Sequence, residues 1–197
     1  MQDVRDPEVV VGRSIARFED AALLTGRGRY LDDLGAPPGT LHAAILRSPH
    51  AHADIVSIDA EAARAMPGVA AVLTGDDIAA LTNSILVGVK APVECWPVAR
   101  DRVRYMGEPV ALVVATDRYL AEDAVDLIDV RYRPLAAVVD PRAAIEADAP
   151  VLHDGLGGNV ISERSFSYGD PDAAFAAAPH TIGLDVTYPR NSCTPIE

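Results

Sequence analysis

The chain has 197 residues, of which 49% are hydrophobic, 23% charged and 5% aromatic, so a disordered chain is excluded and one large domain, or a domain with a small appendage, is expected. The formal net charge of −12 argues against nucleic acid or an anionic membrane surface as a partner. No apolar run approaches the roughly 20 residues that span a bilayer, and residues 1–7 contain no signal-peptide pattern.

Residues 1–40 are predicted to form an irregular N-terminal arm that glycines interrupt repeatedly. Within this arm, residues 20–24 can make one helical turn. Beyond it, residues 40–46 and 55–58 are predicted as the first two strands.

The next stretch alternates short helices and strands. Asp59 stands at the position of a helix N-cap before residues 60–66, which predict an alanine-rich helix that ends at a Pro-Gly pair. Residues 69–73 are predicted as a strand and residues 76–81 as a helix. Prolines interrupt residues 82–104, so we interpret this region as a loop with short extended pieces.

The clearest secondary-structure unit begins at residue 109. Residues 109–115 are a continuous apolar run, which is typical of a strand buried on both faces. Asp117 can cap the helix that follows, and a strand is predicted at residues 130–132. The apolar residues of that helix fall on one face: Ala121, Ala124, Val125 and Ile128.

The last third begins with a loop at residues 141–159, which is rich in proline and glycine. Residues 160–168 and 181–188 alternate in polarity and are predicted as strands. Asp170-Pro171 is a favourable start for a helix over residues 173–178. The interleaved elements predict an α/β (α+β) fold, with helices packed on a mixed sheet.

The histidines offer a candidate metal site, which we weigh against ordinary polar or interface roles. On a strand His50 and His52 would share a face, but a site needs a third ligand, and Ser48-Pro49 favours a turn here instead. We therefore assign no metal ligand among the five histidines, which are His42, His50, His52, His153 and His180.

Paired carboxylates and nucleophiles are equally weak candidates for catalysis. The neighbours Asp32-Asp33 and Asp76-Asp77 point apart and lie near turns or caps, whereas glycosidase chemistry needs carboxyls that face each other. No G-x-S-x-G elbow occurs. Cys193 has no positioned base, and His180 is the nearest histidine in sequence.

The two cysteines, Cys95 and Cys193, are too far apart in sequence for a CxxC motif and too few for a disulfide framework. We interpret them as reduced thiols and expect a cytoplasmic protein.

Six stretches, in order along nearly the whole chain, resemble large subunits of the xanthine dehydrogenase, aldehyde oxidase and carbon monoxide dehydrogenase family. Each stretch is weak alone, but their shared order makes the resemblance specific. They are residues 11–15 (VGRSI), 19–33 (EDAALLTGRGRYLDD), 47–53 (RSPHAHA), 67–78 (PGVAAVLTGDDI), 103–111 (VRYMGEPVA) and 191–197 (NSCTPIE).

The resemblance implies an α/β hammerhead at residues 41–188, after the arm at 1–40, with residues 189–197 as the start of a link to a molybdenum-cofactor-binding half. It implies hydroxylation of a heteroaromatic ring, an aldehyde or carbon monoxide, with oxygen from water. It also implies partner subunits that carry iron-sulfur clusters and FAD, in a homo- or hetero-oligomer. The substrate and the electron acceptor stay open.

The family's cofactor loop, active-site loop and base glutamate are expected beyond residue 197. We therefore carry over no catalytic, cofactor-binding or metal residue, and we expect this chain alone to be structural. Glu197 matches a motif glutamate with no assigned role, and Gly107 and Pro109 are interpreted as a tight turn and a strand entry.

Two alternatives explain such a chain: a part of a molybdenum hydroxylase, either cut from a longer polypeptide or naturally split, or a stand-alone interaction or scaffold domain that kept the fold without the chemistry. The ending inside Thr194–Glu197 favours the first. That reading also predicts an apolar face that the other half covers. The candidates for this face are Val87, Val89, Val93 and Trp96, and the alternative is that these residues close the domain's own core.

Overall fold

The computed structural model describes residues 11–12, 14–88 and 92–189, and the chain divides into two units. One unit combines Met1–Pro38 with Leu184–Glu197, and the other is Gly39–Gly183. The first contains helix α1 (Asp20–Leu24) and a 3-10 helix, η1 (Leu31–Leu34), neither of which has a buried residue. The helical turn that the sequence predicted at residues 20–24 is confirmed.

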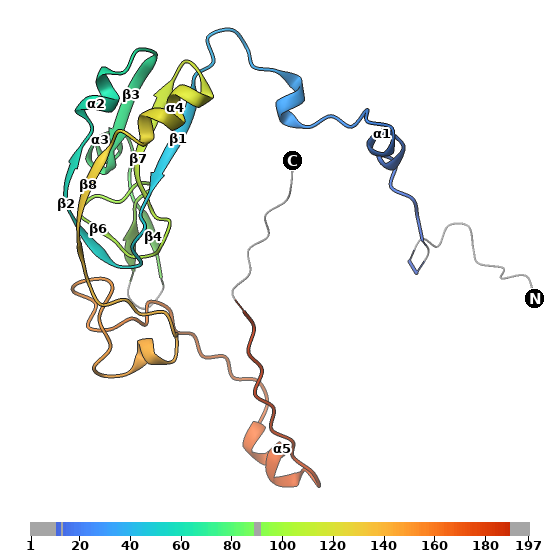
Figure 1. The fold of residues 1–197 in the computed structure, drawn as a ribbon. Coiled ribbons are helices and arrows are strands. Elements are labelled where there is room, and N and C mark those ends of the chain that lie inside the picture. The colour runs from blue at the N-terminus through green and yellow to red at the C-terminus, as the bar shows by residue number, and fades with distance from the viewer. Residues whose placement is uncertain (1–10, 13, 89–91, 190–197) are drawn as a thin grey trace, which may run out of the picture. The chain divides into compact units, whose positions relative to one another are not determined.

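The larger unit is organised around a three-stranded sheet in the order β1–β7–β3. The outer strands β1 (His42–Arg47) and β3 (Val69–Thr74) both pair antiparallel with β7 (Pro109–Ala115) (Figure 1). Val110, Ala111 and Val113 of β7 are fully buried and lie on both faces of the strand. The predicted strand at residues 109–115 and its burial on both faces are confirmed.

Helix α4 (Arg118–Val125) packs across this sheet, mainly against β1 and β7, and also contacts α2 (Glu61–Ala65) (Figure 1). It begins at Asp117, whose carboxylate accepts hydrogen bonds from the backbone N–H groups of the next turn, the first at 2.8 Å from Tyr119. The predicted cap is confirmed. The buried side chains of α4 and α2 are alanines, so the helices approach the sheet closely: Ala63, Ala121 and Ala124.

A second three-stranded sheet has the order β6–β2–β8 and is also antiparallel. Its central strand is β2 (Ala53–Asp59), flanked by β6 (Arg102–Val103) and β8 (Asp129–Pro134). Ile58 and Val130 pack against the hydrophobic clusters of both sheets. These two side chains therefore join the sheets into one core.

The remaining elements are short. Helix α3 (Gly75–Leu81) follows β3 directly, and β4 (Ile85–Val87) pairs with β5 (Val93–Cys95) in a separate two-stranded sheet. Later come a 3-10 helix, η2 (Ala143–Ile145), and helix α5 (Pro171–Ala177). As predicted, Asp170 caps α5, because its side chain accepts a hydrogen bond of 2.9 Å from the N–H of Ala173.

Three sequence predictions need correction. Residues 160–168 and 181–188 form no strand, because the described chain offers them no partner and a lone strand leaves its backbone unpaired. Asp59 precedes the N-cap of α2, which is Ala60, although its carboxylate still accepts a hydrogen bond from Glu61 N at 3.1 Å. The fold class is confirmed, but its strands form small antiparallel sheets where one mixed sheet was expected.

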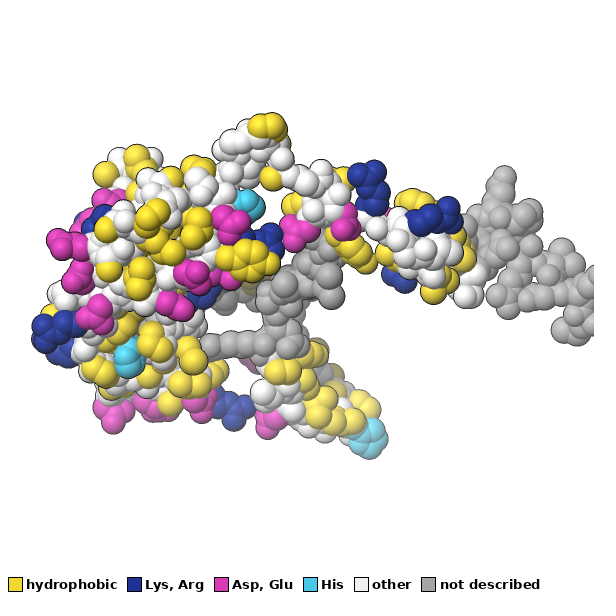
Figure 2. Space-filling model, turned by 45° about the horizontal axis from the view of Figure 1, so that its top comes forward, with side chains coloured by type: hydrophobic (Ala, Val, Ile, Leu, Met, Phe, Trp, Pro, Cys, Tyr) yellow, Lys and Arg dark blue, Asp and Glu magenta, His cyan; other side chains and the backbone are white. Residues whose placement is uncertain are grey.

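Acidic side chains and exposed hydrophobic side chains share the surface shown in Figure 2, in keeping with the net charge of −12. The helices in the described ranges are all too short and too polar to cross a membrane.

We predict that Val113→Asp unfolds the larger unit, because it places an unpaired carboxylate at a fully buried position. The cost should be several kcal/mol, against a total stability of about 5–15 kcal/mol. Val139→Asp introduces the same side chain at an exposed position and should stay within about 0.5 kcal/mol of the wild type. Thermal melts followed by circular dichroism compare them, and equal melting of the two variants would show that β7 is not central.

Candidate functional site

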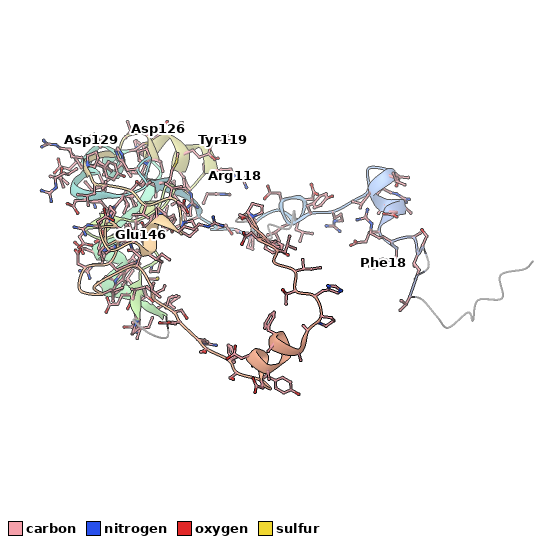
Figure 3. All side chains as sticks on the ribbon, turned by 90° about the horizontal axis from the view of Figure 1, so that it is seen from below. Phe18, Arg118, Tyr119, Asp126, Asp129 and Glu146 are labelled. Atoms are coloured by element: carbon pink, nitrogen blue, oxygen red, sulfur yellow. The ribbon has the colours of Figure 1, made fainter. Side chains whose placement is uncertain are left out.

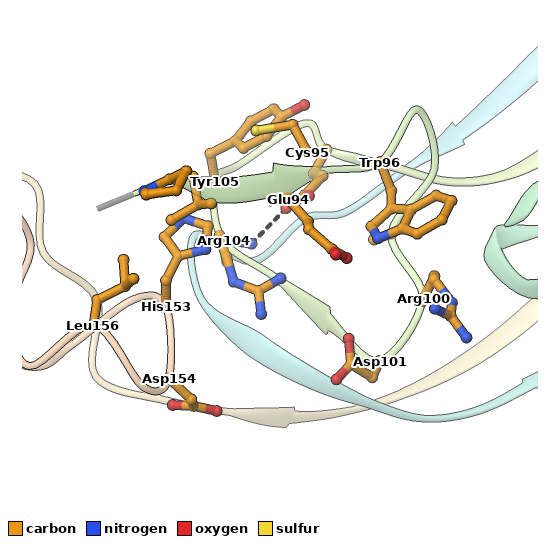
Figure 4. Close-up of a pocket in the computed structure, with 14 residues that line it drawn as sticks. Glu94, Cys95, Trp96, Arg100, Asp101, Arg104, Tyr105, His153, Asp154 and Leu156 are labelled. Atoms are coloured by element: carbon orange, nitrogen blue, oxygen red, sulfur yellow. Dashed lines mark hydrogen bonds between the residues drawn. The ribbon is translucent and has the colours of Figure 1, made fainter. Parts of the chain in front are cut away.

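The larger unit contains a cavity of about 560 Å³, bounded by β5, by the segment 96–108 and by the turn at 153–156 (Figure 4). In the view of Figure 4, His153, Arg104 and Tyr105 lie at one end of the cavity, and Trp96 and Arg100 lie at the other. The ionisable and aromatic residues that line it are Glu94, Cys95, Trp96, Arg100, Asp101, Arg104, Tyr105, Glu108, His153 and Asp154.

One wall of the cavity rests on the start of helix α3. Ala99 and Arg100 pass so close to Gly75 that a Cβ there would lie 2.2 Å from the carbonyl oxygen of Ala99. The N–H of Ala99 donates a 2.8 Å hydrogen bond to the carbonyl of Pro109, the first residue of β7. The wall is therefore fixed on one side by a glycine and on the other by the central strand.

The first turn of α3 also holds Arg100. Thr74 is the N-cap of the helix, and Asp77 completes a capping box, because its carboxylate accepts 2.8 Å hydrogen bonds from both the N–H and the hydroxyl of Thr74. These hydrogen bonds lower the pKa of Asp77. The neighbouring Asp76 pairs with Arg100 at 3.0 Å. The guanidinium of Arg100 lies 5.3 Å from the ring centre of Trp96, a cation–π distance. Arg100 is thus already engaged within its own chain.

The turn between β6 and β7 supplies Arg104 and Glu108. The Glu108 carboxylate accepts a short hydrogen bond from the N–H of Arg104. Burial raises the pKa of Glu108, and the N–H groups of Arg104 and Tyr105 partly oppose that rise. Gly107 has a φ of +88°, as expected of the tight turn predicted here.

The opposite side of the cavity is the turn at 153–156. Arg104 reaches it, because its Nε donates a 2.9 Å hydrogen bond to the carbonyl of Leu152. Burial, and next the positive charge of Arg104, lower the pKa of His153. The neutral imidazole is therefore favoured at this position.

A charge network ties the same turn to the second sheet. Asp54 on β2 accepts a 2.6 Å hydrogen bond from Arg102 and a second contact from Arg133 on β8. Arg102 also pairs with Asp154 at 2.8 Å. Arg133, and then Arg102, lower the pKa of Asp54. Residues from three strands and one loop are thus held together beside the cavity.

The structure disperses the five histidines weighed from the sequence. His50 makes an edge-on ring contact of 4.9 Å with Tyr132, whereas His52 is buried with its Nδ1 2.7 Å from the carbonyl oxygen of Ala136. Only His153 lines the cavity, while His42 lies in β1 and His180 is exposed. Within the described residues, no three metal-ligating side chains come together.

The paired carboxylates serve helix ends and an ion pair. Asp33 accepts a 2.8 Å hydrogen bond from Tyr30 N at the start of η1, and Asp76 and Asp77 act at α3 as described above. Neither pair faces another carboxylate across the cavity. Cys193 and Glu197 lie outside the described residues.

The expected apolar face is only partly present at the proposed positions. Val87 is exposed and Trp96 is half-buried, but Val93 is buried, and Val89 lies outside the described residues.

Sequence reasoning did not identify this cavity. Arg104 and Glu108 stand in the stretch 103–111, which was interpreted only as a turn feeding a strand. His153 comes from a loop far along the chain, and local periodicity carries no signal that these segments meet. The concentration of charged and aromatic residues over 94–108 is the one clue that the sequence offers.

Comparisons with known proteins agree on one family. Residues 25–136 match the family model described as aldehyde oxidase and xanthine dehydrogenase, a/b hammerhead domain. The nicotine 6-hydroxylase large subunit of Paenarthrobacter nicotinovorans is 43% identical over 95% of this chain, which corresponds to 23% of that protein.

Solved structures give the same result. The crystal structure of quinoline 2-oxidoreductase from Pseudomonas putida 86 matches 86% of this chain with a TM-score of 0.71 and 44% identity, over 22% of its own chain. A Cu,Mo-CO dehydrogenase matches 85% of this chain with a TM-score of 0.67 and 38% identity, again over 22% of its own chain. The chain thus spans about a quarter of the length of these relatives.

We predict that Gly75→Ala destabilises the larger unit by about 1–3 kcal/mol or more, because the new Cβ collides with backbone that cannot move aside easily. Gly183→Ala is the matched control, because nothing lies within 4 Å of its Cβ position and its φ is not positive. Urea unfolding measures both variants. Equal midpoints would mean that residues 99–100 do not rest on α3.

We predict that Glu108→Gln changes the pH dependence of stability. The raised pKa means that the folded protein retains the Glu108 proton above the ordinary value of 4.5, where the unfolded chain releases it. Stability from this group is present below 4.5 and is lost as the pH rises through the folded pKa. The melting temperature of the wild type minus that of the variant should therefore fall as the pH rises from about 4 to 8.

We predict the opposite pH dependence of stability for Asp77→Asn. Since the folded pKa of Asp77 is lowered from 3.8, its contribution is present above 3.8 and is lost as the pH falls through the folded value. The difference between wild type and Asp77→Asn should therefore shrink on acidification. The same trend in both variants would contradict the burial of Glu108.

Proposed function

Because the chain belongs to the aldehyde oxidase and xanthine dehydrogenase a/b hammerhead domain family, we propose that it forms the N-terminal hammerhead domain of a molybdenum hydroxylase large subunit. The observation that carries this proposal is that 95% of the chain matches a large subunit of which it spans 23%. The complete enzyme would hydroxylate a heteroaromatic ring, an aldehyde or carbon monoxide, with water as the oxygen source.

The cavity does not fit the molybdenum–pterin cofactor, which is anionic. Its lining has four carboxylates, from Glu94, Asp101, Glu108 and Asp154, against the two guanidiniums of Arg100 and Arg104. Arg100 is paired with Asp76, and Arg104 donates to two backbone carbonyls. An anion would meet an excess of negative charge here, so we assign the cofactor to the rest of the large subunit.

Within that assignment, residues 1–40 form an arm, residues 41–188 form the hammerhead, and residues 189–197 begin the link to the cofactor-binding half. Partner subunits carry the iron-sulfur clusters and FAD, in a homo- or hetero-oligomer. The exposed free thiol of Cys95 supports a reducing compartment, the cytoplasm.

A stand-alone scaffold domain with the same fold is the alternative function. It would work without any cofactor-binding polypeptide. The relatives reported above are named as large subunits or as complete enzymes, which supports the hydroxylase assignment over the scaffold.

We predict that the 197-residue chain alone binds no molybdenum cofactor, and that it supports cofactor loading when it replaces the matching part of the nicotine 6-hydroxylase large subunit. The chimera is co-expressed with the other subunits of that enzyme. Molybdenum per polypeptide is measured by mass spectrometry. We expect background metal in the chain and, in the chimera, a content close to that of the unmodified enzyme.

The matched control is the same chimera with Val113→Asp, which should lose both assembly and metal because the hammerhead cannot fold. Two results would contradict the proposal: stoichiometric molybdenum in the chain alone, or a folded chimera that neither assembles nor takes up the metal.

A further inference from the structure

Strand β4 of the β4–β5 hairpin consists entirely of exposed apolar residues. Ile85, Leu86 and Val87 of β4 are 66%, 67% and 41% exposed. Successive residues of a strand point to opposite faces, so both faces of β4 present apolar side chains to solvent. Among the described residues β4 pairs only with β5, and an isolated two-stranded hairpin is marginally stable in water.

The apolar surface continues at the cavity mouth. Tyr105, which lines the cavity, and its neighbour Met106 are both largely exposed. Strand β5 lies at the same place, because Val93, Glu94 and Cys95 also line the cavity. An exposed apolar surface therefore adjoins a charged hollow, and exposed apolar patches bordered by polar residues mark protein interaction sites.

The charged residues of the cavity indicate which kind of side chain would bind there. Its arginines are engaged within the chain, as described above, whereas the side chains of Glu94 and Asp101 form no ion pair within residues 11–12, 14–88 and 92–189. A cationic side chain would find two carboxylates available. A second copy of this chain, with a net charge of −12, is disfavoured by repulsion.

We infer that the β4–β5 hairpin and the adjoining cavity are a docking surface for the remaining polypeptide of a molybdenum hydroxylase large subunit. That polypeptide covers the hairpin with apolar residues and places one lysine or arginine between Glu94 and Asp101. The inference rests on the proposed function, and the relatives supply its occupant: more than three quarters of their chain lies outside the region that this chain matches.

Cys95 provides a built-in probe, because it is an exposed free thiol on β5 at the cavity. Its alkylation by iodoacetamide is followed by peptide mass spectrometry in the chain alone and in the chimera described above. We expect the rate at Cys95 to fall about tenfold or more in the chimera, because thiol reactivity depends on solvent access. Tyr119→Cys, on the exposed surface of α4 (Figure 3), is the control and should change less than about twofold.

The charged contact is tested separately. Glu94→Lys and Asp101→Lys should each lower the yield of assembled chimera about tenfold, since a buried cation would then face a cation. Glu122→Lys on α4 adds the same charge at an exposed position elsewhere and should leave the yield unchanged.

The outcomes separate the two proposals. A chimera that loads molybdenum while Cys95 stays as reactive as in the chain alone overturns the docking surface and leaves the proposed function standing. Equal protection at positions 95 and 119, or unchanged yields for both lysine variants, also overturns it. A chain that is dimeric by light scattering with Cys95 already protected assigns the surface to a second copy instead. A folded chimera that fails to assemble overturns the proposed function.

Discussion

Burial of β7 on both faces is the constraint on which the larger unit depends. A strand with Val110, Ala111 and Val113 fully buried must have a neighbour on each edge and cover on both faces. Strands β1 and β3 flank it, α4 covers one face, and the cluster of Ala53, Ala99 and Val103 covers Val110 on the other. The same strand then positions the cavity, because the Pro109 carbonyl accepts a hydrogen bond from Ala99 and the preceding residue is Glu108. Residues 99–108 are thus anchored to the buried central strand of the core.

Sequence patterns correctly predicted those elements whose structure depends on residues close by in the chain. The run at 109–115 is apolar throughout because both faces are covered, and Asp117 and Asp170 each satisfy N–H groups that a helix start leaves without partners. Residues 160–168 and 181–188 also alternate in polarity, the first of them only weakly, and still form no strand. Alternation describes one face of a strand, but a strand also needs a partner edge, and no local pattern specifies where that edge comes from.

The candidate site could be predicted even less well, because it is made by segments that are distant in sequence. Gly75 admits the chain at Ala99 only because it lacks a Cβ, and Arg104 reaches Leu152 across a gap of many residues. The stretch 103–109 contains a turn motif, and the structure forms this turn. The motif carries no sign that Arg104 and Glu108 form one side of the cavity and that His153 forms the other side.

The hairpin β4–β5 differs from the two segments that were wrongly predicted as strands. Residues 160–168 lack a partner strand, whereas β4 has a partner strand and lacks cover, which leaves three consecutive apolar side chains in water. Natural sequences are consistent from local propensity to core packing, and departures concentrate where another molecule completes the structure. Charge points to the same place, because Glu94 on β5 and Asp101 nearby line the hollow and form no ion pair within the described part of the chain. An exposed apolar surface and carboxylates without an ion pair therefore adjoin at one hairpin, and a polypeptide surface that is apolar with a single cation would complement both.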